Sequence, residues 1–214
     1  MFFANRTIAP YLFTNRNTAS CVVPGGANPC ARGDQRIVGA VLSHNTPLPG
    51  NLGAAGDKID FYWNVRAGNG FAQPYTESAG FFGNTIAYVQ RKYIFNGSNA
   101  FWYAAVGAND REHVGLSVLE FHPAASGINP RHSVGLDDDF NANAPGWELY
   151  SGFGSTAVWP NSEAGDYLRA RSHNPSGVAW VSTGHSRQGG AYAPSYLVFG
   201  RERDLNGFNR FDQQ

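Results

Sequence analysis

The stretch GDYLRARSHNPSGVAWVSTGHSRQGGAYAPSYLVFGRERD, residues 165–204, decides the fold class of the chain. It contains three strand-like runs, at residues 166–171, 178–183 and 194–201, that are rich in aromatic and β-branched side chains. Asn, Pro and Gly residues, which favour turns, separate these runs. Runs of this length between such turns predict short antiparallel strands.

Similar runs occur throughout the rest of the chain. They predict strands at residues 9–14, 36–43, 60–65, 85–95, 102–106, 114–121, 132–136 and 147–152. No long stretch has the period of an amphipathic helix, and 26 Gly and 12 Pro indicate many turns. A chain of 214 residues is long enough for an all-β domain with a substantial core. Because no linker interrupts the pattern, we expect a single domain over residues 1–204 and a polar tail at residues 205–214.

The charge of the chain is low and balanced, with 16 basic and 16 acidic residues. This balance predicts no basic surface that would attract nucleic acid. No apolar run is long enough to span a bilayer. The first residues, MFFANRTIAP, lack the basic region and apolar core of a signal peptide. We therefore expect no nucleic-acid partner, no membrane span and no signal peptide within this sequence.

The two cysteines lie close together in the segment CVVPGGANPC, at Cys21 and Cys30. The Pro-Gly-Gly turn between them can bring the two sulfurs together. A disulfide here would stabilise the fold by roughly 2–3 kcal/mol and would indicate an oxidising compartment. The alternative is a pair of reduced cysteines in a loop. The disulfide is favoured because no further Cys or His completes a zinc-binding set.

An internal repeat relates two parts of the chain. Residues 102–121, WYAAVGANDREHVGLSVLEF, align without a gap with residues 166–185, DYLRARSHNPSGVAWVSTGH, at an offset of 64. Tyr103 falls on Tyr167, and Val114 falls on Val178. Each copy reads as a strand, a polar turn and a second strand. A repeat of this size is typical of one four-stranded sheet, and radially repeated sheets of this kind form β-propellers. A β-sandwich, built from the same short strands, is the alternative fold.

The turn SHNPSGVAW in the second copy resembles the Asp-box of sialidase-type (BNR repeat) propellers. The resemblance is carried by Ser172, Asn174, Gly177 and Trp180, although Asn stands in place of Asp and one residue is inserted. The order NDREHVGL, VGLDDDFN, PGWELY, GDYLRAR, RQGG and PSYLVFGRERD is similar to the C-terminal part of secreted bacterial proteins of uncharacterised activity that carry such propellers. The likeness covers residues 20–204, most specifically residues 102–204. It implies three to four blades, part of a longer or completed ring, and an extracellular location.

The start of the quoted stretch offers candidate ligand-binding residues. Asp166, Tyr167 and Arg169 lie at a predicted strand start, where a propeller places residues near its axis. An aromatic ring can stack on a sugar, and an arginine beside it can bind a carboxylate. The alternative is that Asp166 caps a turn and Arg169 pairs with a neighbouring blade. The full candidate set consists of Asp166, Tyr167, Arg169, Trp159, Asn109, Asp110 and Arg111.

The acidic turn LDDDFNANAPGWE offers oxygen ligands. Asp137, Asp139, Asn141 and Glu148 have the spacing of positions 1, 3, 5 and 12 of a calcium loop. Ala142 stands where an EF-hand needs Gly, and strands rather than helices are predicted on both sides. A looser calcium site at Asp137, Asp139 and Asn141 and a solvated acidic turn both remain open. No other cofactor is indicated.

The resemblance to sialidases does not extend to their catalytic residues. Their Phe/Tyr-Arg-Ile-Pro motif is absent, and only Arg36-Ile37 matches part of it. We therefore expect a non-catalytic extracellular module that binds carbohydrate or another surface ligand, or serves as an interaction scaffold. The first alternative is a glycoside hydrolase with carboxylates at the propeller axis. The second is a truncated gene product without independent activity, which associates through exposed strand edges.

Overall fold

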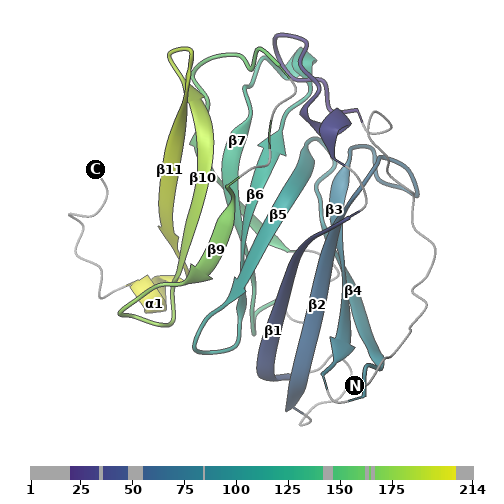
Figure 1. Cartoon of the computed structure of the whole chain (residues 1–214), viewed down its shortest axis with the longest axis vertical. Coiled ribbons are helices and arrows are strands. Elements are labelled where there is room, and N and C mark those ends of the chain that lie inside the picture. Colours follow the sequence, from purple (N-terminus) through teal and green to yellow (C-terminus); the bar gives the residue numbers. More distant parts are fainter. Residues whose placement is uncertain are drawn as a thin grey trace.

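The described residues form three antiparallel sheets, which confirms the predicted all-β class (Figure 1). The computed structural model describes residues 20–33, 36–47, 55–83, 85–141, 147–161, 164 and 167–205. Within these residues, every predicted run overlaps an observed strand. The strand predicted at residues 9–14 lies outside the described residues.

In each sheet the strands follow one another in chain order as an antiparallel meander. The first sheet contains β1 (Ile37–Pro47), β2 (Ala55–Val65), β3 (Tyr75–Phe82) and β4 (Tyr88–Ile94). The second contains β5 (Ala100–Ala108), β6 (Val114–Phe121), β7 (Arg131–Asp137) and β8 (Glu148–Gly154). The third contains β9 (Arg169–Ser172), β10 (Trp180–Gln188) and β11 (Ala191–Phe199). The short helices are η1 (Pro29–Arg32), η2 (Ala124–Ser126) and α1 (Glu202–Leu205).

The leading strands of the three sheets lie next to one another. β1 packs against β5 and β5 packs against β9, and Figure 1 shows the three strands side by side across the middle of the view. Further out, β10 packs against β6 and β7. The second sheet therefore lies between the other two, with one neighbour on each face.

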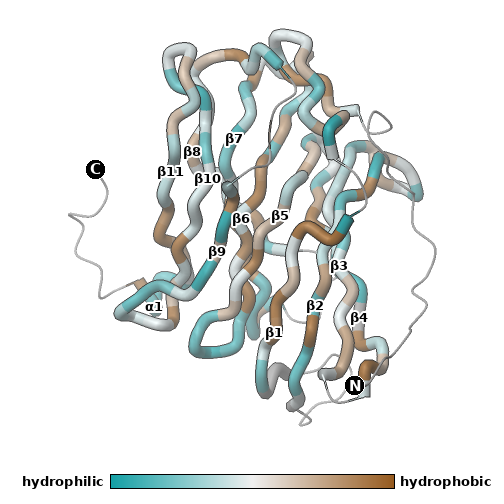
Figure 2. Tube along the Cα trace, in the orientation of Figure 1, coloured by the Kyte–Doolittle hydropathy of each residue, from teal (hydrophilic) through white to brown (hydrophobic). Residues whose placement is uncertain are grey.

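Hydrophobic side chains fill both spaces between the sheets. Along the Cα trace in Figure 2, hydrophilic residues lie in turns at the lower ends of the strands. Tyr62, Leu116 and Trp147 pack between the first and second sheets. Between the second and third sheets, Trp180 is buried and its Nε1 donates a hydrogen bond to the Gly107 carbonyl at 2.9 Å. This tryptophan fixes the third sheet on the second.

The repeat at an offset of 64 residues corresponds to equivalent pieces of structure. The first copy forms β5 and β6, the first two strands of the second sheet, and the second copy forms β9 and β10 of the third. In the turn that resembles an Asp-box, Ser172 Oγ donates to the Gly177 carbonyl at 3.0 Å, and Gly177 has a left-handed φ of 66°. The same Gly177 carbonyl also accepts a hydrogen bond from the Asp110 amide at 2.8 Å, so the turn joins the third sheet to the second as well as closing on itself.

One strand, β3, has no counterpart among the predictions. Both faces of this strand are buried, so its sequence YTESAGFF shows no alternation between apolar and polar residues. Glu77 lies on one buried face and forms an ion pair with Arg91 of β4. Pairing with β2 and β4, rather than local pattern, makes this segment a strand.

The predicted disulfide between Cys21 and Cys30 is confirmed. Its loop packs with Trp102, Phe121 and Trp159 in a buried cluster at one end of the second sheet. A search of the described residues for a helix long and apolar enough to cross a membrane finds none.

Candidate functional site

The first strand of the third sheet, β9, carries two exposed arginines. Arg169 and Arg171 are two residues apart, so they lie on the same face of the strand. Ala170 between them is buried and pairs with Ser182, which bonds to His132 of the second sheet. The arginines therefore lie on the opposite face, turned away from the second sheet.

The register of the third sheet adds residues of β10 and β11 to this face. Arg169 lies opposite Thr183, and Thr183 lies opposite Tyr196. Directly opposed residues in an antiparallel sheet have Cβ atoms about 4.5–5.5 Å apart and share a face. Tyr196 is 56% exposed and Thr183 is also exposed. We call the surface formed by Arg169, Arg171, Thr183 and Tyr196 the arginine face.

Tyr167 lies beside the arginine face, at the entry to β9. Its side chain is 91% exposed and its backbone is left-handed, with φ of 69°. Thr183 Oγ1 donates a hydrogen bond to the Tyr167 carbonyl at 3.4 Å, which places Tyr167 next to the Arg169 row. The strand begins at Arg169 rather than at the predicted residue 166, so Tyr167 precedes the strand instead of belonging to it.

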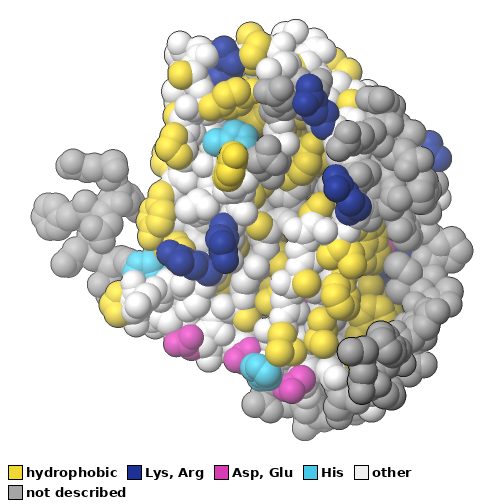
Figure 3. Space-filling model, viewed as in Figure 1, with side chains coloured by type: hydrophobic (Ala, Val, Ile, Leu, Met, Phe, Trp, Pro, Cys, Tyr) yellow, Lys and Arg dark blue, Asp and Glu magenta, His cyan; other side chains and the backbone are white. Residues whose placement is uncertain are grey.

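The two arginines have no carboxylate partner in the part of the chain that the structure describes. Other arginines are paired: Arg91 with Glu77, Arg111 with Asp204, and Arg201 with Asp138. The strands β9, β10 and β11 contain no Asp or Glu. Figure 3 shows basic side chains over the middle and upper parts of this view and acidic ones gathered at its lower end. Among the described residues, the arginine face is therefore a positive surface without an acidic partner.

The other predicted ligand-binding residues lie elsewhere. Asp166 is outside the described residues. Trp159 is fully buried, and its ring stacks on His185 at 5.6 Å between centroids instead of facing solvent. The structure thus brings Tyr167 and Arg169 together at the surface, whereas Trp159 is buried in the core.

Asn109, Asp110 and Arg111 form the turn between β5 and β6, which docks on the third sheet. Asn109 Nδ2 donates to the Val178 carbonyl at 2.6 Å, and the Asp110 amide donates to the Gly177 carbonyl at 2.8 Å. Arg111 forms an ion pair with Asp204 of α1 at 2.8 Å. These contacts hold the second and third sheets together.

The acidic turn after β7 is occupied by basic partners. Asp137 pairs with Lys92, and Arg203 donates to Asp139 at 3.1 Å. Asn141 accepts a bond from the Asp138 amide at 2.7 Å and donates to the Leu136 carbonyl at 2.7 Å. The residues predicted to bind calcium therefore have separate partners within the protein.

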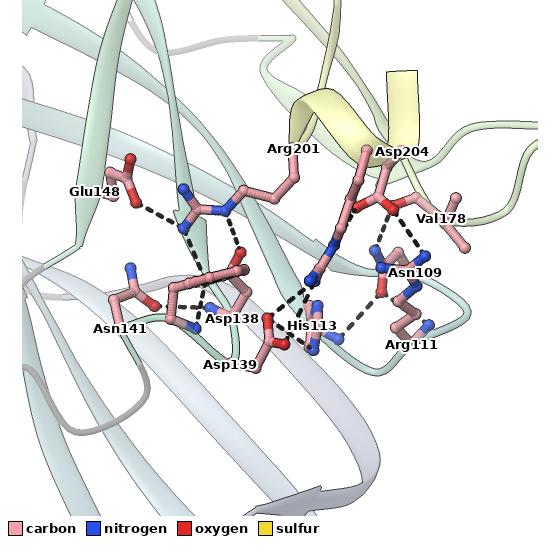
Figure 4. A network of polar contacts seen from close by, with 12 residues as sticks. Asn109, Arg111, His113, Asp138, Asp139, Asn141, Glu148, Val178, Arg201 and Asp204 are labelled. Atoms are coloured by element: carbon pink, nitrogen blue, oxygen red, sulfur yellow. Dashed lines mark hydrogen bonds and ion pairs between the residues drawn. The ribbon is translucent and has the colours of Figure 1, made fainter. Parts of the chain in front are cut away.

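Asp138, which the sequence did not single out, is the centre of the network in Figure 4. Arg201 reaches between Asp138 and Glu148 and donates to Asp138 at 2.6 and 2.9 Å. Burial alone would raise the pKa of Asp138, but the bonds from Arg201 and from the Phe140 amide outweigh it and lower that pKa. His113, Asp138 and Asp139 have ligand atoms within 4.8 Å of one another. Arg201 and Arg203 neutralise the carboxylates of Asp138 and Asp139. The geometry therefore favours an ion-pair network that joins the segment after β11 to the turn after β7, rather than a cation site.

A second polar network, around His132, lies buried between the second and third sheets. Ser117 and Ser182 lie 2.9 and 2.7 Å from His132 Nε2, and Ser195 lies 2.7 Å from Nδ1. Burial lowers the pKa of His132 to about 4, with a smaller contribution from His185. All of these side chains are buried, so this His and Ser group is inaccessible to a substrate and joins two sheets.

Comparison with known proteins adds no assignment. No protein-family model matches the chain, and no curated protein matches it significantly.

Proposed function

We propose that the chain is an extracellular, non-catalytic module with sialidase-like propeller architecture that binds an acidic carbohydrate on its arginine face. The observation that carries the binding proposal is the pair Arg169 and Arg171, exposed and without a carboxylate partner among the described residues, beside the exposed rings of Tyr167 and Tyr196. Arginine binds carboxylates and sulfates through paired hydrogen bonds, and tyrosine rings pack against sugars. An acidic sugar offers an acidic group to the arginines and a ring face to the tyrosines.

Two features support the propeller architecture. The sheets are meanders in chain order, and their leading strands β1, β5 and β9 are neighbours, as radially arranged blades require. The internal repeat occupies equivalent positions in consecutive sheets. The disulfide supports an extracellular location, since disulfides persist in oxidising compartments.

The absence of acidic side chains from the strands of the third sheet supports a binding role rather than hydrolysis. Glycoside hydrolysis needs two carboxyl groups that flank one bond, about 5–9.5 Å apart. Strands β9, β10 and β11 supply no carboxyl group to the arginine face. Elsewhere in the described residues, the buried carboxylates Glu77 and Glu120 are each held by neighbouring side chains.

Calorimetric titration with sialyllactose and polygalacturonate, and with the neutral controls lactose and dextran, tests the proposal. We expect binding of an acidic ligand only, weakened at least tenfold by Arg169→Ala/Arg171→Ala because charge-assisted bonds are lost. Arg66→Ala/Arg131→Ala removes the same charge from other surfaces and should leave affinity unchanged. Equal binding of neutral and acidic sugars, or binding unaffected by loss of the two β9 arginines, would refute the proposal. Release of reducing sugar would refute the non-catalytic role.

A further inference from the structure

The connection between the first and second sheets contains an asparagine followed by a glycine. β4 ends at Ile94, β5 begins at Ala100, and Asn96 and Gly97 lie in the exposed segment between them. The side-chain amide of an asparagine in this position can be attacked by the glycine nitrogen, because glycine has no Cβ to hinder a close approach of its backbone. The arrangement around Asn96 determines whether this attack is favoured.

Two backbone amides point at the side-chain carbonyl of Asn96. The Ser98 amide donates to Asn96 Oδ1 at 2.9 Å, and the Asn99 amide donates to the same atom at 2.6 Å. Attack on Asn96 Cγ moves negative charge onto Oδ1. Donors that are fixed in advance around a developing oxyanion stabilise the transition state of such a reaction. The two amides therefore have the positions of oxyanion donors for an attack on this side chain.

Gly97 supplies the attacking nitrogen directly next to this carbonyl. Asn96, Gly97 and Ser98 are exposed, so water reaches the segment. A side chain built at Gly97 would meet nothing within 4 Å among the described residues, so no packing opposes the approach of its nitrogen to Asn96 Cγ. Asn99, by contrast, is buried, and its Nδ2 donates to Glu120 Oε1 at 2.6 Å. The segment is therefore anchored at Asn99, whereas its reacting end has room to rearrange.

A second Asn-Gly pair, Asn69-Gly70, has a different setting. It forms a two-residue turn in which Gly68 and Phe71 exchange both backbone hydrogen bonds, at 2.8 and 3.0 Å. Both residues of the pair have positive φ, 52° and 90°, as a tight hairpin turn of type I′ requires. Among the described residues, Asn69 has no pair of amide donors like the pair at Asn96. Attack at Asn69 has to distort a closed turn without oxyanion donors, so we expect it to be slower.

We propose that Asn96 is a site of spontaneous deamidation, with water as the co-reactant. The Gly97 nitrogen bonds to Asn96 Cγ and gives up its proton, the bond from Cγ to Nδ2 breaks, and the side-chain nitrogen leaves as ammonia. Water then opens the cyclic imide on either side, which yields aspartate or isoaspartate at residue 96. No oxidant or reductant takes part. This site is separate from the arginine face and does not depend on the proposed carbohydrate ligand.

Isoaspartate changes the connection between the two sheets, because it carries the main chain through the former side-chain carbon. On one side of the connection, the Phe95 ring packs on Phe71 at 4.8 Å between centroids. On the other side, Asn99 holds Glu120. The lengthened link alters the spacing between these two anchors. We therefore expect the isoaspartate form to be less stable than the original chain, whereas the aspartate form keeps a side-chain oxygen for both amides and stays as stable.

The test incubates the full chain at pH 8 and follows deamidation at Asn96 and Asn69 by peptide mass spectrometry. In the folded chain, we expect the rate at Asn96 to be at least tenfold higher than the rate at Asn69. In concentrated guanidinium chloride, which removes the amide donors and the hairpin turn alike, the two rates should be similar. This comparison separates the effect of the structure from that of the Asn-Gly sequence, which both sites share.

Two substitutions at Ser98 isolate one of the amide donors. Ser98→Pro removes the amide that donates at 2.9 Å and should slow deamidation at Asn96 at least threefold. Ser98→Ala keeps that amide and should leave the rate unchanged. Gly97→Ala hinders the attack and should slow it at least tenfold, which keeps the test valid if the proline variant does not fold. Asn69 is the internal reference in every variant.

Three results would overturn the proposal. The first is a folded chain in which Asn96 reacts no faster than Asn69. The second is a rate at Asn96 that Ser98→Pro and Gly97→Ala both leave unchanged. The third concerns the connection between the sheets: equal stability of the purified isoaspartate form and the original chain in urea denaturation would contradict the expected effect.

Discussion

His132 shows how a single buried side chain makes stability depend on pH. Its folded pKa of about 4 lies below the usual 6.5, so the unfolded chain binds more protons between these values. Stability contributed by neutral His132 is therefore complete above pH 6.5 and is lost as the pH falls toward 4. The shift corresponds to about 3 kcal/mol over this range.

Replacing His132 tests this prediction. Urea denaturation of the original chain and of His132→Gln, from pH 4 to 7, should show that the variant loses less stability as the pH falls. Glu77→Gln serves as a control with the opposite sign. Burial raises the pKa of Glu77 to about 7, so its ionised form costs stability as the pH rises from 4.5 to 7. Parallel pH profiles for the original chain and His132→Gln would contradict the assignment.

At this scale, local pattern predicted some site residues and not others. Tyr167 and Arg169 are neighbours in sequence, so an aromatic residue beside an arginine was visible there. Thr183 and Tyr196 join them only through the register of three strands. The serines around His132 come from three different strands besides its own, and no spacing in the sequence relates them.

At the scale of elements, the contact between β6 and β10 depends on a glycine. A side chain at Gly115 would meet Trp180 Cδ1 at 2.4 Å, and Trp180 is held in place by its bond to Gly107. Gly115→Ala should therefore destabilise the protein by about 1–3 kcal/mol, the usual cost of overpacking. Thermal or urea denaturation measures this loss of unfolding free energy. Gly97→Ala is the matched control, because a side chain at Gly97 meets nothing within 4 Å. Equal stability of the two variants would show that Trp180 can move.

The positions of most elements were predictable because each strand has one apolar run between turn residues. The exception, β3, is buried on both faces and lacks alternation. The functions of turns were harder to predict. The acidic turn after β7 has the spacing of calcium ligands, yet Lys92, Arg201 and Arg203 approach its carboxylates from distant parts of the chain. The spacing of residues shows the aspartates of this turn, but it does not show the lysine and arginines that approach them in the fold.

At the scale of the whole molecule, polar contacts between sheets determine which faces meet. Lys92 of β4 pairs with Asp137 of β7 between the first and second sheets, and both side chains are buried. The nearby buried pair of Lys58 and Asp60, at 3.1 Å, lies within β2. Buried ion pairs often add little net stability, because desolvation offsets their attraction. Replacing one partner of a buried ion pair is costly, since it leaves the other charge buried and unpaired. We infer that the Lys92–Asp137 pair selects the arrangement of the two sheets rather than stabilises it strongly.

Single and double replacements of the Lys92–Asp137 pair distinguish selection from net stabilisation. Lys92→Met alone leaves Asp137 buried without its partner and should cost about 3–5 kcal/mol of unfolding free energy. Lys92→Met/Asp137→Leu removes both charges and should restore most of that loss, measured by urea denaturation at pH 7. Near-UV circular dichroism reports whether the aromatic packing around Trp147, which belongs to the same space between sheets, is kept. If the double variant is no more stable than Lys92→Met alone, the pair contributes net stability, because an apolar replacement of both charges would otherwise have recovered the cost of the unpaired carboxylate.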